Sequence, residues 1–227
     1  LVPMITETFA RGDVGQMHRQ LNQTFQVLLF LTLPACLGIS ILAEPIYTFF
    51  YGANELGANI LQFYAPVAIL FALFSVTAAI IQGLNEQKFT VFSLLLGLLI
   101  KMLINIPLIE RFETKGAILA TAIGYSIAII INLFVIYHYA RYPFHLVIRR
   151  SIFIAILSLI MGGAVGVLYK VLALFLSPEA RIPSVVLVLI CAVGGAFLYF
   201  VLAWRSRLVQ FLFPAQVKKL KEKWASH

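Results

Sequence analysis

The chain of 227 residues is 62% hydrophobic and 11% charged, and its mean hydropathy is +0.98. A soluble globular protein of this length needs far more polar surface. The composition therefore excludes a soluble protein and predicts an integral membrane protein. The formal net charge of +8 does not indicate a nucleic-acid partner. Lys and Arg cluster beside apolar spans, as topology signals and contacts with anionic membrane lipids do.

Six apolar stretches are each long enough to cross a bilayer. They cover residues 24–43, 58–82, 89–109, 116–139, 151–176 and 184–204. The expected fold is therefore all-α, a polytopic membrane helix bundle of six complete transmembrane helices. The chain opens on the apolar LVPMI, without a charged targeting region or a cleavage site. We therefore expect residues 1–5 to be the end of a preceding helix and the chain to be a fragment.

The spans divide the chain into successive regions. Residues 1–23 hold the end of the preceding helix and a cytoplasmic amphipathic connector, 24–140 four transmembrane helices, 141–150 a basic cytoplasmic connector, 151–204 a further pair of transmembrane helices, and 205–227 a basic cytoplasmic tail.

Polar segments mark where helices end. Residues 12–13, Gly-Asp, predict a turn that is followed by a helix from Met17. Residues 44–57 predict a loop whose aromatic side chains suit the lipid headgroup region. Residues 82–85, QGLN, predict a tight turn before the third span, and residues 110–115 predict the loop that follows it.

The third span carries one charge, Lys101, near its middle. A cation at the centre of a spanning helix costs about 2.5–3.5 kcal/mol, so we expect it to face protein or trapped water. At about 100° per residue, Thr90, Gly97, Lys101 and Asn105 share one narrow face, which predicts a polar seam. Two interpretations are open: a functional residue in a cavity, or a structural lysine paired with a carboxylate on a neighbouring helix.

The fourth span has a small or amide side chain at every fourth position. These residues are Gly116, Ala120, Gly124, Ala128 and Asn132. Small residues at this spacing let helix backbones approach, so the pattern predicts a close-packing face. For Asn132, both an interhelical hydrogen bond and a place in a binding site are open.

The fifth span places Gly162 and Gly166 four residues apart, which predicts a flat packing face on that helix. The two cysteines, Cys36 and Cys191, both lie in apolar spans. There we expect small buried side chains rather than a disulfide.

The distribution of positive charge predicts the orientation in the membrane. Of the 17 Lys and Arg residues, Lys101 and Lys170 lie within spans, and only Arg111, Lys115 and Arg181 lie on the side opposite the C-terminal tail. Because Lys and Arg accumulate in cytoplasmic loops, we expect both ends of the chain to be cytoplasmic.

Several kinds of chemistry have no support in the sequence. It contains no Gly-rich phosphate loop, no metal-type spacing of Cys and His, and no pair of intramembrane carboxylates. We therefore expect no enzyme, no cofactor and no metal site. Transport or a structural membrane role remains.

Four segments carry a resemblance to a known superfamily: LVPMITETFARGD, LPACLGISILAEPIYTFFYG, APVAILFALFSVTAAIIQGLNEQKF and LLIKMLINIPLIERFETKGAILATAIGY. They resemble the multidrug/oligosaccharidyl-lipid/polysaccharide exporter (MOP) superfamily. Within it, the sequence looks most like the lipid II flippase MurJ group and the related stage V sporulation protein B-like polysaccharide biosynthesis proteins.

The resemblance implies two six-helix bundles that form a V around a central cavity, with two further C-terminal helices in the flippase group. The first four spans would complete the C-terminal bundle, and 151–204 would be the extra pair. The implied function is a flippase that moves a lipid-linked oligosaccharide, a lipid II-like peptidoglycan precursor or a polysaccharide repeat unit, to the outer leaflet of the bacterial plasma membrane by alternating access. The implied partners are a polyprenyl diphosphate-linked sugar, membrane lipids and the N-terminal half of the transporter.

By the same likeness, the candidate substrate-binding residues are Lys101, Asn105, Gly97, Asn132 and Gln82. Lys101 would meet the diphosphate, Asn105 would donate a hydrogen bond, and Gly97 would leave room for the headgroup. Gly162 and Gly166 of the extra pair would line a groove for the lipid tail.

Two other functions are weighed against this one. The first is a cation-coupled multidrug exporter of the MATE type, which would need an intramembrane carboxylate to bind H⁺ or Na⁺. The second is a structural membrane protein without transport, in which Lys101 could be changed freely. Every Asp and Glu lies in a loop, at the edge of a span or in the tail, which disfavours the exporter.

Overall fold

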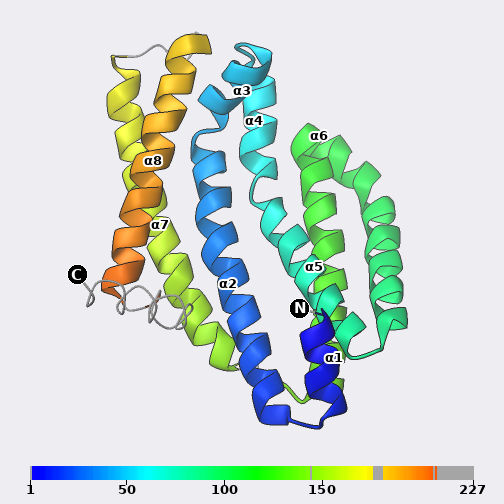
Figure 1. Cartoon of the computed structure of the whole chain (residues 1–227). Helices are drawn as coiled ribbons and strands as arrows, with labels where there is room; N and C mark the ends of the chain where they lie inside the picture. Colours follow the sequence, from blue (N-terminus) through cyan, green and yellow to red (C-terminus); the bar gives the residue numbers. More distant parts are fainter. Residues whose placement is uncertain (1, 144, 176–180, 207, 209–227) are drawn as a thin grey trace, which may run out of the picture.

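The computed structural model describes residues 2–143, 145–175, 181–206 and 208, and the helices in these ranges run side by side (Figure 1). They are α1 (Val2–Ala10), α2 (Val14–Ile41), α3 (Ala43–Tyr51), α4 (Glu55–Tyr64), α5 (Val67–Gly83), α6 (Gln87–Ala140), α7 (His145–Ala173) and α8 (Arg181–Arg205). The described residues form no other regular structure, so the predicted all-α helix bundle is confirmed. Most of the predicted tail, 205–227, lies outside the described residues.

Within the described ranges, five helical segments are long and apolar enough to cross a membrane, where the sequence predicted six. The difference lies in α6, whose 54 residues would form a rod of about 80 Å, far beyond the roughly 30 Å hydrocarbon core. Figure 1 shows that α6 folds back on itself. The reversal is at Glu113, whose φ of 51° and ψ of −132° are not helical. The predicted loop at 110–115 is thus reduced to one non-helical residue between a first arm (87–112) and a second arm (114–140).

The loop predicted at 44–57 is mostly helical, which corrects the sequence analysis. α3 carries Pro45 in its first turn, where the missing N–H has no helical partner to lose. Pro45 and Thr48 are buried, whereas Phe49 and Phe50 are exposed with ring centroids 4.7 Å apart. The aromatic cluster is therefore the outer face of a short amphipathic helix.

The predicted turn at Gly12 and Asp13 is present, and the helix after it begins before Met17. Gly12 has a φ of 68°. The Asp13 carboxylate accepts a hydrogen bond from the Gln16 N–H at 2.9 Å. Because this caps a free N–H of the first turn, α2 begins at Val14.

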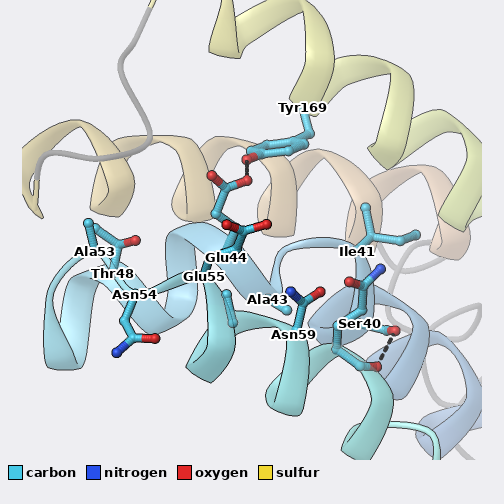
Figure 2. A pocket seen from close by; sticks show the side chains of 12 residues that line it. Ser40, Ile41, Ala43, Glu44, Thr48, Ala53, Asn54, Glu55, Asn59 and Tyr169 are labelled. Atoms are coloured by element: carbon cyan, nitrogen blue, oxygen red, sulfur yellow. Dashed lines mark hydrogen bonds between the residues drawn. The ribbon is translucent and has the colours of Figure 1, made fainter. Parts of the chain in front are cut away.

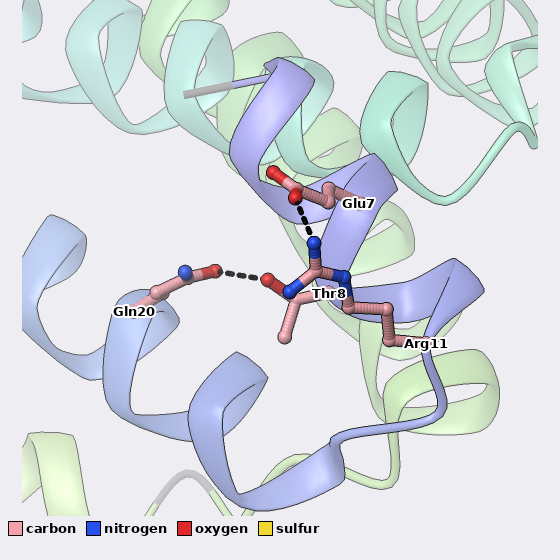
Figure 3. Close-up of polar contacts among 4 residues, drawn as sticks. All are labelled: Glu7, Thr8, Arg11 and Gln20. Carbon is pink, nitrogen blue, oxygen red and sulfur yellow. Dashed lines mark hydrogen bonds and ion pairs between the residues drawn. The ribbon is translucent and has the colours of Figure 1, made fainter.

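Helix α1 packs on α2 by apolar burial and by hydrogen bonding. Ile5 is fully buried in the adjoining core. The Thr8 hydroxyl donates to Gln20 Oε1 at 3.1 Å, and Figure 3 shows this bond beside the ion pair of Glu7 and Arg11. That pair is exposed and joins Glu7 of α1 to Arg11, the residue after the end of α1, so it contributes only about 0.3–0.5 kcal/mol.

The second predicted span, 58–82, consists of two helices, α4 and α5. They are separated at Pro66, which has no N–H to continue the helical ladder. After α5, Asn85 adopts a left-handed φ of 61°, a conformation that Asn tolerates better than most residues. The predicted turn at 82–85 is confirmed.

The basic connector predicted at 141–150 is largely helical, because α7 already begins at His145. Arg141, with a left-handed φ of 47°, ends α6. Figure 1 shows α2 between the α7–α8 pair on one side and α4, α5 and α6 on the other. One core cluster joins α2, α7 and α8 and includes Phe30, Ile154, Leu157, Cys191 and Tyr199. A second joins α1, α2, α5 and α6 and includes Ile5, Leu21, Ile80 and Ile136.

Candidate functional site

The first arm of α6 turns its polar seam toward protein. Thr90 and Gly97 are buried, and Lys101 and Asn105 are partly buried. The apolar residues on the other faces are exposed, namely Leu95, Leu99, Met102, Leu103 and Ile106. The seam predicted from helical spacing is present.

Gly97 and Gly124 bring the two arms of α6 into backbone contact. A Cβ added to Gly97 would lie 2.5 Å from the Gly124 carbonyl oxygen. One added to Gly124 would lie 2.7 Å from the Gly97 carbonyl oxygen and 3.1 Å from Lys101 Cβ. The space at Gly97 that the sequence analysis assigned to a headgroup is occupied by the second arm, so this glycine serves helix packing.

Lys101 borders a small cavity of about 70 Å³ between the arms, which Thr121 and Tyr125 also line. This volume is enough for a few water molecules. Across the described ranges, no carboxylate forms an ion pair with Lys101. The structural interpretation, a lysine paired with a neighbouring carboxylate, therefore has no partner in the described part of the chain. The functional interpretation requires an anion that the described residues do not supply.

Asn132 lies at the centre of a buried hydrogen-bonded cluster. The Ser93 hydroxyl of the first arm donates to Asn132 Oδ1 at 2.6 Å. Asn132 Nδ2 in turn donates to Thr77 Oγ1 of α5 at 3.1 Å. All three side chains are fully buried. Asn132 thus joins α5 to both arms of α6, which is the interhelical role that the sequence left open.

Sequence reasoning missed Ser93 and Thr77. A signal for Ser93 was available, because it stands four residues before Gly97 and eight before Lys101 on the same helical face. Thr77 has no such signal, since its partner is 55 residues away along the chain.

Gln82 is not brought to the seam. It is exposed at the end of α5, beside the turn that leads into α6. The helix from Gln87 to Lys101 is about 21 Å long. Asn105, by contrast, lies one turn beyond Lys101 on the same face.

Gly162 and Gly166 pack against α2. A Cβ added to Gly162 would lie 3.1 Å from Ile41 Cδ1, and one added to Gly166 would lie 3.9 Å from Ile41 Cγ2. The flat packing face predicted for this helix is therefore present, and it is covered by Ile41.

An apolar groove of about 410 Å³ lies between α2 and the α7–α8 pair. Its walls include Phe30, Pro34, Gly38, Met161, Val165, Cys191, Gly195 and Tyr199. Cys191 and Cys36 are buried free thiols, as the sequence predicted. Sequence reasoning did not find the groove, although Pro34 and Gly38 stand one turn apart in an otherwise bulky span.

Within the described ranges, no group of three or more His, Cys, Asp or Glu side chains is arranged to hold a metal ion.

Comparison with known proteins relates these features to one family. Residues 1–185 match the family model described as "Lipid II flippase MurJ". The chain is 44% identical over 215 residues to the Lipid II flippase MurJ of Bacillus subtilis (strain 168), covering 92% of this chain and 40% of that protein. It is 28% identical over 204 residues to the uncharacterized membrane protein YabM of the same organism, covering 88% of this chain and 37% of that protein.

A solved structure shares the fold. It is titled "Lipid II flippase MurJ, inward closed conformation", with a TM-score of 0.67 and 20% identity, and it is matched over 92% of this chain and 42% of that one. The chain spans about two fifths of the length of the Bacillus subtilis flippase and of the protein in this solved structure. This multi-pass membrane protein chain belongs to the lipid II flippase MurJ family.

Proposed function

We propose that this chain is the C-terminal part of a flippase that moves a lipid-linked oligosaccharide of the lipid II class from the inner to the outer leaflet of the bacterial plasma membrane. The observation that carries the proposal is 44% identity, over 92% of the chain, to a protein named as a lipid II flippase. Because the chain covers only 40% of that protein, transport is assigned to the full-length protein. The cargo crosses by alternating access and is chemically unchanged.

Lys101 is the proposed contact for the diphosphate of the cargo. Its ammonium group is a compact positive charge of the kind that binds phosphate oxygens. The absence of an ionic partner within the described residues is consistent with a role for an external anion. Asn105, one turn away and also partly buried, is the proposed donor of a hydrogen bond to the same group.

Substitution of Lys101 in the full-length protein tests the proposal. Lys101→Ala removes a charge-assisted contact of about 1.5–3 kcal/mol, so transport should fall roughly tenfold to a hundredfold. Lys101→Arg should retain part of the activity, and Lys101→Glu should transport least because it repels the diphosphate. The measurement is the appearance of labelled glycolipid in the outer leaflet at matched expression. Lys170→Ala, which removes an exposed lysine on α7, is the control.

Wild-type transport by Lys101→Ala would reject the proposed role. Absence of transport by the unsubstituted full-length protein, in contrast, would favour the structural membrane protein without transport. The cation-coupled exporter has no support from the described carboxylates, because Glu44, Glu55 and Glu113 are exposed at helix ends. An exporter of that type needs a carboxylate within the membrane.

The proposed topology has six spans and cytoplasmic ends. Each arm of α6 crosses once, and the excess of Lys and Arg on the side of the tail sets the orientation. An impermeant thiol reagent applied to intact cells should label Asn54→Cys and leave Arg149→Cys unlabelled, in a background without Cys36 and Cys191. The opposite pattern would reject this orientation.

The lipid tail of the cargo is assigned to the apolar groove beside α8. We assign the lipid tail to the walls of this groove and not to Gly162 and Gly166, because Ile41 covers the face of these two glycines. A photoactivatable polyprenyl lipid should form adducts on α7 and α8. Adducts confined to residues 24–140 would exclude the extra pair from tail binding.

A further inference from the structure

A polar cavity of about 570 Å³ opens where α2, α3 and α4 meet α7. It lies at the end of the bundle where α6 reverses (Figure 1). Figure 2 shows the Tyr169 hydroxyl bonded to Glu44, with Glu55 also lining the cavity. We call this space the Glu44 cavity. It is separate from the Lys101 seam and from the apolar groove, and none of the candidate residues of the sequence analysis lines it.

The walls of the Glu44 cavity are held in place by specific contacts. The Ser40 hydroxyl of α2 donates to the Gln62 carbonyl oxygen of α4 at 2.7 Å. The Tyr169 hydroxyl of α7 donates to Glu44 Oε2 of α3 at 2.7 Å. Gly57 lies directly against the Tyr47 ring, where a Cβ would clash, so α3 and α4 pack closely. A cavity built from interlocked helices is a better binding site than one built from loops.

Several polar groups that line the Glu44 cavity are not engaged by other described side chains. In the described residues, the Glu55 carboxylate and the side-chain amides of Asn59 and Gln62 have no hydrogen-bonding or ionic partner. Thr48 adds a hydroxyl to the lining. The lining thus offers carboxylate acceptors together with amide and hydroxyl groups that both donate and accept.

The charge and the volume of the Glu44 cavity restrict the class of ligand that it can bind. Among the described residues, the lining has two carboxylates and no Lys, Arg or His, so it repels phosphates and other anions. A single metal ion needs oxygen ligands at about 2.0–2.6 Å, which fits a cavity of this size poorly. A volume of 570 Å³ falls in the range of small-molecule sites. Tyr169 adds a flat aromatic surface at its edge.

We propose that the Glu44 cavity is a binding site for a saccharide unit that is neutral or carries an amino group. Carboxylate and amide groups satisfy the hydroxyls of a sugar in both hydrogen-bonding directions, and an amino group adds attraction to Glu44 and Glu55. The position of the cavity on the outer side of the membrane rests on the proposed topology. Its binding chemistry does not.

Saturation-transfer NMR on the full-length protein in detergent micelles tests this proposal. The probes are glucosamine, N-acetylglucosamine and N-acetylglucosamine 6-phosphate. The first two should give saturation transfer, and the phosphorylated sugar should bind at least about tenfold more weakly because its charge faces two carboxylates. The double substitution Glu44→Gln, Glu55→Gln should weaken glucosamine binding by about tenfold or more, since it removes charge-assisted contacts.

Two control variants make the outcomes separable. Glu110→Gln removes an exposed carboxylate outside the cavity and should leave saccharide binding unchanged. Lys101→Ala should also leave it unchanged while transport falls, so failure of this proposal and failure of the proposed transport are distinguished. Glu44→Gln keeps an acceptor for the Tyr169 hydroxyl, so the helix packing is retained.

Equal glucosamine binding by the double variant would overturn the proposal. So would tighter binding of the phosphorylated sugar, or no saturation transfer to either unphosphorylated sugar. Displacement of glucosamine by Mg²⁺ at equal concentration would make the cavity a cation site and would also overturn it.

Discussion

Replacing Gly97 by Ala tests whether this residue serves helix packing. Ala is intrinsically better than Gly in a helix by about 0.5–1 kcal/mol. At Gly97, however, the new Cβ would lie 2.5 Å from the Gly124 carbonyl oxygen and 3.2 Å from Ala128 Cβ. Forcing an extra carbon into packed helices costs about 1–3 kcal/mol. The net effect should be destabilising.

Gly163 on α7 provides the matched control. A Cβ added there meets nothing within 4 Å. Since both substitutions are Gly→Ala within helices, the intrinsic helix term is common to both and cancels in the comparison. Gly97→Ala should therefore be about 1–3 kcal/mol less stable than Gly163→Ala.

The assay is reversible unfolding of the full-length protein in mixed micelles by titration with dodecyl sulfate, followed by circular dichroism. Gly124→Ala should be destabilising as well, and the double variant should be less damaging than the sum, because both carbons strain the same contact. Equal stability of Gly97→Ala and Gly163→Ala would refute the packing role. If Gly97→Ala then lowered substrate binding alone, the headgroup role would be restored.

Two further predictions concern buried polar side chains. Asn132→Leu removes the hydrogen-bonding partner of the Ser93 and Thr77 hydroxyls. It should lower the free energy of unfolding by about 1 kcal/mol in the same titration, because an average interhelical hydrogen bond in membranes is worth roughly 0.6 kcal/mol and an unsatisfied buried group costs about 1–3 kcal/mol. An unchanged unfolding midpoint would contradict this prediction. Burial raises the pKa of Tyr142, which lies between α6 and α7. The contribution of Tyr142 to stability is complete below the unfolded-state pKa of about 10 and is lost as pH rises further. Tyr142→Phe should therefore reduce the loss of stability above about pH 10. An identical dependence of stability on pH in both proteins would contradict this expectation.

The local features of α6 could be read from its sequence. Thr90, Gly97, Lys101 and Asn105 share a face because helical geometry repeats every 3.6 residues, and the structure buries that face at least partly. The close-packing pattern that includes Gly124 was likewise visible as small residues four apart. Neither pattern states which helix lies opposite.

The helix boundaries were less predictable. Residues 44–57 contain loop-forming signals, yet α3 forms there because Pro45 and Thr48 can be buried against the bundle. The loop at 110–115 contracts to a reversal at Glu113 because the two arms pack on each other from Gly97 and Gly124. In both places burial against other helices decided whether the segment forms a helix or a loop, because the helix propensities of the local residues differ too little to decide it.

The sequence by itself determined that this chain lies in a membrane as a helix bundle and that one helix carries a cation on a polar seam. These properties follow from composition and from contacts within one or two helical turns. Only the tertiary structure decided which residues lie against each helix face. Gly124 packs against Gly97, Thr77 and Ser93 form hydrogen bonds with Asn132, and Ile41 packs over Gly162. The two cavities likewise form between several helices and cannot be read from any one span. The physical reason is that these neighbours lie tens of residues apart or more, and helical periodicity specifies a direction from the axis without specifying the partner found there.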